Sequence, residues 1–257
     1  IQGSGSFTNQ GTINVSNGDT LSLNSNIWSN SGTIAVTGGT LDLQGNGLTL
    51  AQLGAVTHSG GLVNLQTTLD DTGTTLNLGT GTGLGTLTLA TSGTIQNGTI
   101  VDQGSGIAFA GGTLSGVSYD GTLNLSSTSS YVYITNGLTL AGASGTGLGT
   151  INLTGQGAYI YAEGGQTLNN ATLNIGNSNG YNYLYNYDPY GIAVLTLGAS
   201  LTINQVGTYA ILDTSYYGRP ASGIVNAGTI NAGQSGGNFT IQGSGSFTNQ
   251  GTINVSN

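Results

Sequence analysis

Charged side chains are the scarcest component of this sequence. Its 257 residues include nine acids and a single base, Arg219, which gives a net charge of -8 at pH 7. The polar faces of helices are normally built from charged residues, so this composition excludes a helical protein. One arginine cannot neutralise a phosphate backbone or hold the chain on anionic lipids. Nucleic-acid binding and electrostatic attachment to membranes are therefore excluded as well.

Cysteine and methionine are absent, and proline occurs only twice. Without cysteine the chain has no disulfide or thiolate chemistry, although this does not decide its compartment. No apolar run approaches the roughly 20 residues of a membrane-spanning helix, so no membrane insertion is expected. The 48 glycines could suggest disorder, but disordered chains are rich in charge and poor in β-branched residues. The short strips of Thr, Ile, Val and Leu in this chain instead predict a folded all-β protein.

A long internal repeat is present. Residues 1–17 read IQGSGSFTNQGTINVSN and recur unchanged as residues 241–257, an offset of 240 residues. The simplest interpretation is one unit, residues 1–240, followed by the start of the next identical unit, residues 241–257. We therefore expect the chain to be part of a longer tandem array.

A shorter period lies inside the long one. Short alternating strips such as TLSL and TLNL end at Gly, Asn or Ser, and the alternation places apolar residues on one face. Strands this short, separated by residues that tolerate left-handed backbone angles, indicate two or three strands per coil, stacked in parallel. Six Thr-Leu/Ile-Asn triplets mark the coils at spacings of 22 to 30 residues, centred on Leu123, Ile151, Leu173, Ile203, Ile230 and Ile253.

These patterns predict a parallel β-solenoid with about nine to twelve coils per 240-residue unit, advancing about 45 to 58 Å along its axis. A β-sandwich is the alternative, since sandwiches also use short alternating strands. An open solenoid end exposes unpaired strand edges, and a following repeat would cover them. Adjacent identical units are therefore the expected partners, end to end, with neighbouring fibres or surface glycans as further candidates.

The strings at residues 92–125 and 225–233 resemble the repeats of giant bacterial surface proteins. These are the filamentous-haemagglutinin-like and autotransporter-passenger β-solenoids. The resemblance implies a right-handed parallel β-helix at the bacterial cell surface or outside the cell, acting in adhesion, biofilm or fibre formation. It supplies no catalytic residues.

Tyrosines form the most distinctive local pattern. Three Tyr-x-Tyr strips recur at spacings of 28 and 24 residues, close to one coil each. They are expected to stack with Val132, Ile160 and Leu184 pointing inward and the tyrosines outward. Such a surface could bind sugar rings, or it could simply stabilise the sheet. The candidate glycan-binding residues are Tyr131, Tyr133, Tyr159, Tyr161, Tyr181, Tyr183, Tyr185 and Tyr187, with Tyr190 widening the patch.

The asparagines of the triplets form a second pattern. If the triplets stack coil on coil, their amides can form a ladder of the kind seen in cross-β stacks. The sequence alone leaves open whether this ladder faces inward or outward. Its members are Asn124, Asn152, Asn174, Asn204, Asn231 and Asn254.

The acids do not form a catalytic pattern. Asp70 and Asp71 are adjacent, so in a strand they would point to opposite faces, and their surroundings, LDDTGTT, are typical of a turn. Asp188 in NYDPYG is also interpreted as a turn residue. Asp213 and Arg219 flank a stretch that is interpreted as a surface loop, with a small polar site as the alternative.

Metal and cofactor sites are not expected. His58 has no second histidine and no cysteine to share a metal with. The calcium-binding repeat motifs are absent, which leaves a single calcium ion at the Asp70–Asp71 turn as an open alternative.

These observations together favour a non-enzymatic structural module of an extracellular filament or giant adhesin. A carbohydrate- or receptor-binding region is the first alternative, and a polysaccharide-degrading enzyme or an ice-binding face is more remote.

Overall fold

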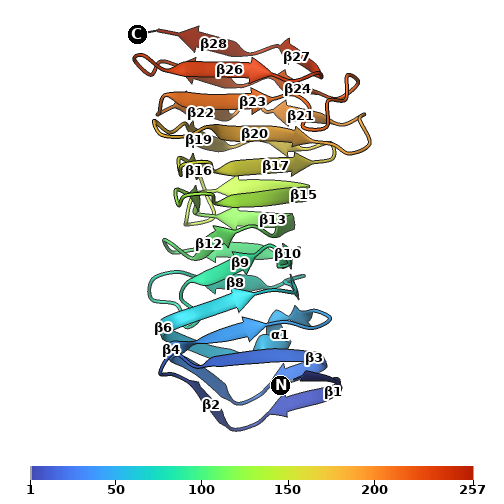
Figure 1. The fold of residues 1–257 in the computed structure, drawn as a ribbon, viewed down its shortest axis with the longest axis vertical. Helices are drawn as coiled ribbons and strands as arrows, with labels where there is room; N and C mark the ends of the chain where they lie inside the picture. Colours follow the sequence, from blue (N-terminus) through green and yellow to red (C-terminus); the bar gives the residue numbers. More distant parts are fainter. Residues whose placement is uncertain (1, 257) are drawn as a thin grey trace. The chain divides into compact units, whose positions relative to one another are not determined.

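The computed structural model describes residues 2–256, so Ile1 and Asn257, the outermost residues of the two 17-residue copies, lie outside it. The protein is a parallel β-solenoid of about eleven turns, in agreement with the nine to twelve expected. It divides into two compact units, residues 1–113 and 114–257. Figure 1 shows the strands of each unit lying one above the next.

The first unit has one large parallel sheet. Along its long strands buried side chains alternate with more exposed ones, so that one face of each strand packs in the core. In order across the sheet they are β1 (Gln2–Asn9), β3 (Thr20–Asn30), β4 (Thr33–Leu43), β6 (Ala55–Leu65), β9 (Leu87–Ala90) and β12 (Ile107–Ala110), with β2 (Thr12–Val15) paired to β4. Shorter parallel pairings join β5 (Leu48–Thr49) to β7 (Thr68–Asp70), β7 to β10 (Thr94–Gln96), and β8 (Thr75–Leu78) to β11 (Thr99–Asp102).

One helical turn interrupts the first unit. Helix α1 (Leu50–Leu53) begins at Thr49, whose hydroxyl accepts a hydrogen bond from the backbone N–H of Gln52. The side chain of Gln52 accepts in return from the N–H of Thr49 at 2.8 Å, which completes a capping box. Leu53 is buried, so the helical turn fills the place that a strand takes in other coils.

The second unit is more regular, with three parallel sheets that we name by their residues. The tyrosine sheet contains β15 (Tyr131–Ala141), β17 (Tyr159–Glu163), β20 (Asn182–Tyr187), β23 (Tyr209–Asp213) and β26 (Asn238–Gln242), and β13 (Thr113–Asp120) pairs with β15. The asparagine sheet contains β14 (Thr122–Leu125), β16 (Gly149–Leu153), β19 (Ala171–Ile175), β22 (Leu201–Gln205), β25 (Thr229–Ala232) and β28 (Thr252–Val255). The short sheet contains β18 (Thr167–Leu168), β21 (Val194–Leu197), β24 (Gly223–Asn226) and β27 (Ser246–Asn249).

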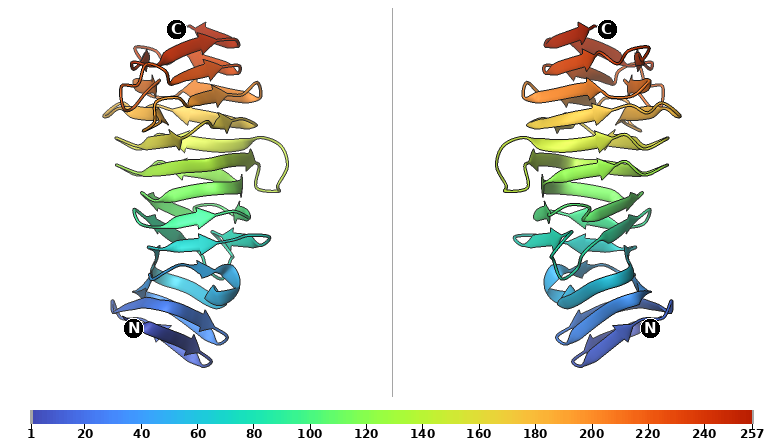
Figure 2. Two further views of the ribbon diagram at one scale, coloured as in Figure 1. Left: turned by 90° about the vertical axis from the view of Figure 1, so that its right-hand side faces the viewer. Right: turned by 90° about the vertical axis from the view of Figure 1, so that its left-hand side faces the viewer.

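The chain enters the asparagine sheet at β14, and from β17 onward it visits the tyrosine, short and asparagine sheets in turn. Figure 2 shows these coils edge on, as successive layers of arrows from green to red. Each coil therefore adds one strand to each sheet at the spacing of paired strands, about 4.8 Å.

The six Thr-Leu/Ile-Asn triplets occupy matching positions in the asparagine sheet. Ile151 pairs with Leu173, which pairs with Ile203, and all three side chains are fully buried. The threonines of the same triplets lie on the opposite face and are half-buried. Burying each such Leu or Ile side chain contributes about 1.5 to 3 kcal/mol, so the apolar column is the main source of stability.

Candidate functional site

Two columns of tyrosines cover the outer face of the tyrosine sheet. Parallel pairing aligns Tyr131 with Tyr159 and Tyr183, and it aligns a second column two residues along. The residues between them, Val132, Ile160 and Leu184, have no exposed surface, so the tyrosines point away from the core. The second column consists of Tyr133, Tyr161 and Tyr185.

The rings of the second column are stacked. Tyr161 lies with its ring centroid 4.7 Å from Tyr133 and 5.1 Å from Tyr185, at interplanar angles of 16° and 6°. Tyr183 and Tyr185 are also parallel, with centroids 4.7 Å apart. Offset or edge-on pairs of this kind stabilise neighbouring strands by about 0.5 to 1.5 kcal/mol each.

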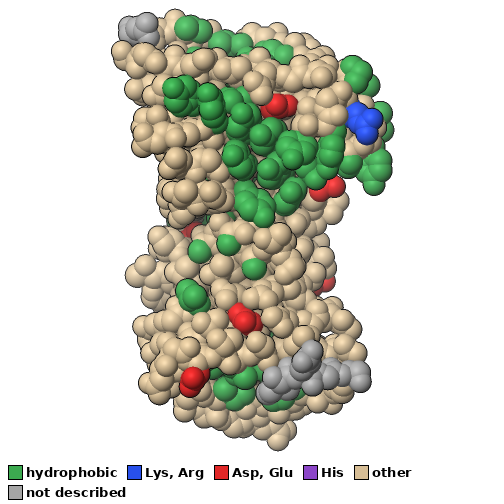
Figure 3. All heavy atoms as spheres, in the orientation of Figure 1, with side chains coloured by type: hydrophobic (Ala, Val, Ile, Leu, Met, Phe, Trp, Pro, Cys, Tyr) green, Lys and Arg blue, Asp and Glu red, His purple; other side chains and the backbone are tan. Residues whose placement is uncertain are grey.

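Three further tyrosines join this surface, and the sequence pattern did not identify them: Tyr209, Tyr216 and Tyr217. The loop between β23 and β24 places Tyr216 edge-on against Tyr161 and Tyr185, with centroids 5.5 Å and 5.0 Å away. The hydroxyl of Tyr217 donates to that of Tyr187 at 2.5 Å. Together they form the tyrosine surface, visible as clustered green side chains in Figure 3: Tyr131, Tyr133, Tyr159, Tyr161, Tyr181, Tyr183, Tyr185, Tyr187, Tyr209, Tyr216 and Tyr217.

A buried asparagine holds the loops around the tyrosine surface. Asn186 in β20 is fully buried, and its Oδ1 has no hydrogen-bond partner among the described residues. Its Nδ2 donates to three backbone carbonyl oxygens, those of Ala193 at 3.0 Å, Thr214 at 3.2 Å and Gly223 at 2.8 Å. These carbonyls belong to the segments on either side of the tyrosine-bearing loop, so one side chain fixes both ends of it.

Asp188 organises the neighbouring loop. Its carboxylate accepts from the backbone N–H groups of Tyr190 at 2.9 Å, Ile192 at 2.5 Å and Ala193 at 2.5 Å. Burial alone would raise the pKa of Asp188, but these backbone hydrogen bonds outweigh it and lower the pKa below the ordinary value. The carboxylate accepts these hydrogen bonds from backbone amides of its own loop, in agreement with the interpretation of Asp188 as a turn residue.

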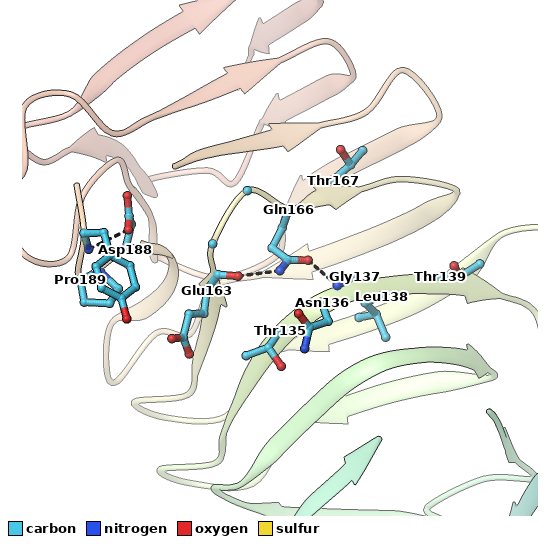
Figure 4. Close-up of a pocket in the computed structure, with 13 residues that line it drawn as sticks. Thr135, Asn136, Gly137, Leu138, Thr139, Glu163, Gln166, Thr167, Asp188 and Pro189 are labelled. Atoms are coloured by element: carbon cyan, nitrogen blue, oxygen red, sulfur yellow. Dashed lines mark hydrogen bonds between the residues drawn. The ribbon is translucent and has the colours of Figure 1, made fainter. Parts of the chain in front are cut away.

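A pocket of about 730 Å³ opens beside the tyrosine sheet. It is lined by the middle of β15, by residues 163–167 from the end of β17 to the start of β18, and by the loop that follows β20. Figure 4 shows Gln166 spanning it: its Nε2 donates to the carbonyl of Glu163 at 2.5 Å, and its Oε1 accepts from the N–H of Gly137 at 2.9 Å. Tyr190 lines this pocket with an 86% exposed ring, so it lies here and not within the ring contacts of the tyrosine surface.

Burial raises the pKa values of four tyrosines above the ordinary value of about 10. The effect is greatest for Tyr161 and Tyr185, and it is smaller for Tyr133 and Tyr183. In each case neighbouring phenolates would add repulsion, but desolvation is the main cause.

This arrangement predicts a loss of stability in alkali. Above a pH of about 10 the unfolded chain releases phenolic protons that the folded chain retains, so the free energy of unfolding falls as the pH rises toward the folded pKa values. We expect the double substitution Tyr161→Phe with Tyr185→Phe to reduce this loss, and Tyr190→Phe, at an exposed ring, to leave it unchanged. Urea unfolding followed by circular dichroism across this pH range tests the prediction. A loss of stability in alkali that is as large in the double variant as in the native chain would contradict it.

The structure places the triplet asparagines in consecutive pairing positions on the outer face of the asparagine sheet. Nδ2 of Asn174 donates to Oδ1 of Asn152 at 2.9 Å. The same bond joins Asn231 to Asn204 at 2.8 Å and Asn254 to Asn231 at 2.9 Å. Asn124 pairs in register with Asn152 at the other end of the ladder. The Oδ1 of Asn124 has no hydrogen-bond partner among the described residues, so the ladder is stabilised by the three amide bonds between the other members.

A second set of asparagines is buried at the corner between strands, in the motif Asn-x-Gly-Thr-Ile. Asn9, Asn30 and Asn226 are 7%, 5% and 1% exposed. Asn30 donates to the carbonyls of Leu53 and Ala55 in the next coil, at 3.1 Å and 3.0 Å. The motif is visible in the sequence, but the inward direction of its side chain depends on the turn.

The two adjacent acids do not share a site. Asp70 faces outward, and its carboxylate accepts from Thr72, Gln96 and Asn97, which lowers its pKa. Asp71 is fully buried, and desolvation raises its pKa despite hydrogen bonds from Thr74 and Leu76. Both acids therefore serve the turn in which they lie.

The remaining polar candidates are also held by local contacts. The ring nitrogens of His58 lie 3.1 Å from the carbonyls of Leu84 and Gly61. Asp213 accepts from the N–H of Ser215 at 3.0 Å and from Nε2 of Gln242 at 3.2 Å. Across residues 2–256, no three acidic or histidine side chains gather closely enough to hold a metal ion.

The fold defines this chain as a β-helix repeat protein. No protein-family model, curated protein or solved structure matches it. Among the described residues, the one helical segment, of four residues, is far too short to cross a bilayer.

Proposed function

We propose that this chain is a structural repeat module of an extracellular bacterial filament or giant surface adhesin. The observation that carries the proposal is the asparagine sheet, in which six coils pair in unbroken register from β14 to β28. The last of these strands has an open edge, and its sequence repeats that of residues 12–15. The resemblance of residues 92–125 to bacterial surface repeats supports the cell-surface setting.

The proposed mechanism is mechanical. Each coil is joined to the next by backbone hydrogen bonds along the axis, by buried Leu and Ile side chains, and by the asparagine ladder. Like charges stacked about 4.8 Å apart would repel along the whole stack, and the uncharged Thr, Ser and Asn surface avoids this repulsion. Repeat number would then set the reach of the filament.

Electron microscopy of the native cell surface and of the secreted fraction tests this function. We expect uniform thin fibres that carry the protein, identified with antibody labelling. Compact particles of the mass of a single module would overturn it.

The tyrosine surface favours a second function, carbohydrate binding. Its outermost rings are accessible, with Tyr181, Tyr216 and Tyr217 exposed by 52%, 45% and 42%. Aromatic faces stack on sugar rings, and phenolic hydroxyls supply hydrogen bonds. The pocket lined by Glu163, Gln166 and Tyr190 lies near the ends of the same strands and offers polar groups beside the aromatic ones.

A glycan array probed with the native chain and with two variants tests this second function. We expect the double substitution Tyr216→Ser with Tyr217→Ser to reduce binding at least tenfold, because it removes two exposed rings from the outside of the tyrosine surface. Val206→Ser, at a 46% exposed apolar side chain outside the tyrosine surface, is the matched control. Equal glycan binding by all three proteins would assign the tyrosines a purely structural role.

A further inference from the structure

The two copies of the 17-residue string take the same local conformation over ten residues. Residues 6–15 form the end of β1, a turn and β2, and residues 246–255 form β27, a turn and β28. Before this stretch the copies differ: β1 is continuous from Gln2, whereas the chain bends between β26 and β27. The correspondence therefore covers strand, turn and strand.

The two copies pair on opposite sides. The first copy pairs with the coil that follows it, so that Asn9 lies against Asn30 and Ile13 against Ile34. The second copy pairs with the coil that precedes it, where the partners of Asn249 and Ile253 are Asn226 and Ile230. Each copy thus leaves free the side that the other copy uses.

The backbone hydrogen bonds of the turn use different atoms in the two copies. In the first copy the carbonyl of Asn9 accepts from the N–H groups of Ser31 and Gly32, at 2.9 Å and 3.1 Å. In the second copy the N–H groups of Gln250 and Gly251 donate to the carbonyl of Asn226, at 2.7 Å and 2.9 Å. One segment can make both sets at once, because one set uses its carbonyls and the other its amides.

The corner asparagine shows the same complementarity. Nδ2 of Asn9 donates to Oδ1 of Asn30 at 2.8 Å, and Oδ1 of Asn249 accepts from Nδ2 of Asn226 at 2.7 Å. The two bonds run in the same direction along the chain. A single asparagine in this position would link Asn226 to Asn30 in one continuous row.

The valines and glycines of the two copies also differ in which of their sides is packed. Val15 is 3% exposed, whereas its counterpart Val255 is 80% exposed and lies on an open face. A Cβ atom on Gly251 would overlap the carbonyl oxygen of Gly228, whereas a Cβ on Gly11 meets no atom within 4 Å. A glycine is therefore required at this position only where the preceding coil packs against it, as at Gly251. No described residue packs on that side of Gly11.

We propose that the 17-residue string is a junction coil shared by consecutive repeats, with residues 223–232 of one repeat on one side and residues 27–36 of the next on the other. The partner of the open end is therefore a second copy of this chain, docked in a fixed register with no linker between the stacks. This inference rests on the proposed function, because it requires consecutive repeats.

A two-repeat chain, residues 1–240 followed by residues 1–257, tests the junction by spin labelling. The chain has no cysteine, so labels can be placed at single engineered positions. Labels at Thr229→Cys of the first repeat and Thr33→Cys of the second should lie about 10 Å apart, twice the spacing of paired strands, and should broaden the spectrum strongly. Thr202→Cys with Thr252→Cys in the single 257-residue chain spans two coils of one column and is the positive control.

A glycine substitution supplies the second measurement. Gly11→Ala should leave the single chain folded, yet in the second repeat of the two-repeat chain it should abolish the broadening. Gly165→Ala should change neither, because a Cβ atom on Gly165 meets no atom within 4 Å and its backbone angle is not left-handed. Circular dichroism of every variant separates lost docking from lost folding.

The outcomes separate this inference from the proposed function. Fibres without spin coupling across the junction would overturn the shared coil and leave the structural function standing. Spin coupling in a protein that never forms fibres would support the junction and overturn the filament. Loss of coupling caused by Gly165→Ala as readily as by Gly11→Ala would also contradict the shared coil.

Discussion

Leu173→Asp is expected to unfold the second unit. Leu173 lies fully buried in β19 between Ile151 and Ile203, so the substitution would place an unpaired carboxylate inside the apolar column. Even truncation of a buried Leu to Ala costs about 2 to 5 kcal/mol, and a buried charge without a partner costs more. The total stability of a domain is about 5 to 15 kcal/mol, so the folded unit should not survive.

The neighbouring threonine supplies the matched control for this prediction. Thr172 is on the same strand and pairs with Thr150 and Thr202, but it faces outward. Thr172→Asp should cost no more than about 1 kcal/mol, because the carboxylate remains in water. Urea unfolding followed by circular dichroism compares the two variants. Equal destabilisation by both would contradict the inward and outward alternation on which the solenoid depends.

Asn186→Leu should destabilise the second unit by about 1 to 3 kcal/mol. The substitution keeps the size of the side chain but removes the Nδ2 donor from three buried carbonyls. The carbonyls of Ala193 and Thr214 still accept from the N–H of Gly223 at 3.2 Å and from Oγ of Ser222 at 3.4 Å, so the main loss is at the carbonyl of Gly223. A buried polar group left without a partner costs about 1 to 3 kcal/mol. The loop that carries Tyr216 and Tyr217 should then detach from the tyrosine surface.

Two measurements check this prediction. Urea unfolding gives the loss of stability, and chymotrypsin should cut the loosened loop after Tyr216 or Tyr217 in the variant before it cuts the native chain. The control is Asn204→Leu in the half-exposed ladder, which should cost about 0.5 to 1 kcal/mol because one solvent-accessible hydrogen bond is lost. If chymotrypsin cuts the loop no faster in the Asn186→Leu variant than in the native chain, contacts other than those of Asn186 hold the loop in place.

The coil stacking of the second unit could be predicted because its sequence signals are local and periodic. The alternation in a strip such as Thr172–Asn174 indicates which side chain is buried, and the spacing of the triplets indicates which residues pair. The first unit could not be predicted in the same detail. Its helix α1 stands where other coils have a strand, and the only signal was the spacing of Thr49 and Gln52. No sequence feature predicts the boundary between residues 113 and 114.

The tyrosine surface was only partly predictable for a related reason. Tyr133 and Tyr161 lie on strands, so their spacing of one coil indicates contact. Tyr216 reaches the same surface from an irregular loop, and its position depends on the buried side chain of Asn186. Hydrogen bonds between segments this far apart in sequence leave no periodic pattern.

Cryo-electron microscopy of a chain with several consecutive repeats tests the central claim, that the coil stack continues from repeat to repeat. We expect one uninterrupted stack of layers spaced about 4.8 Å apart, in which equivalent residues recur every 45 to 58 Å, about eleven coils. Separate particles joined by unstacked chain, or stacks whose register differs from one junction to the next, would contradict it.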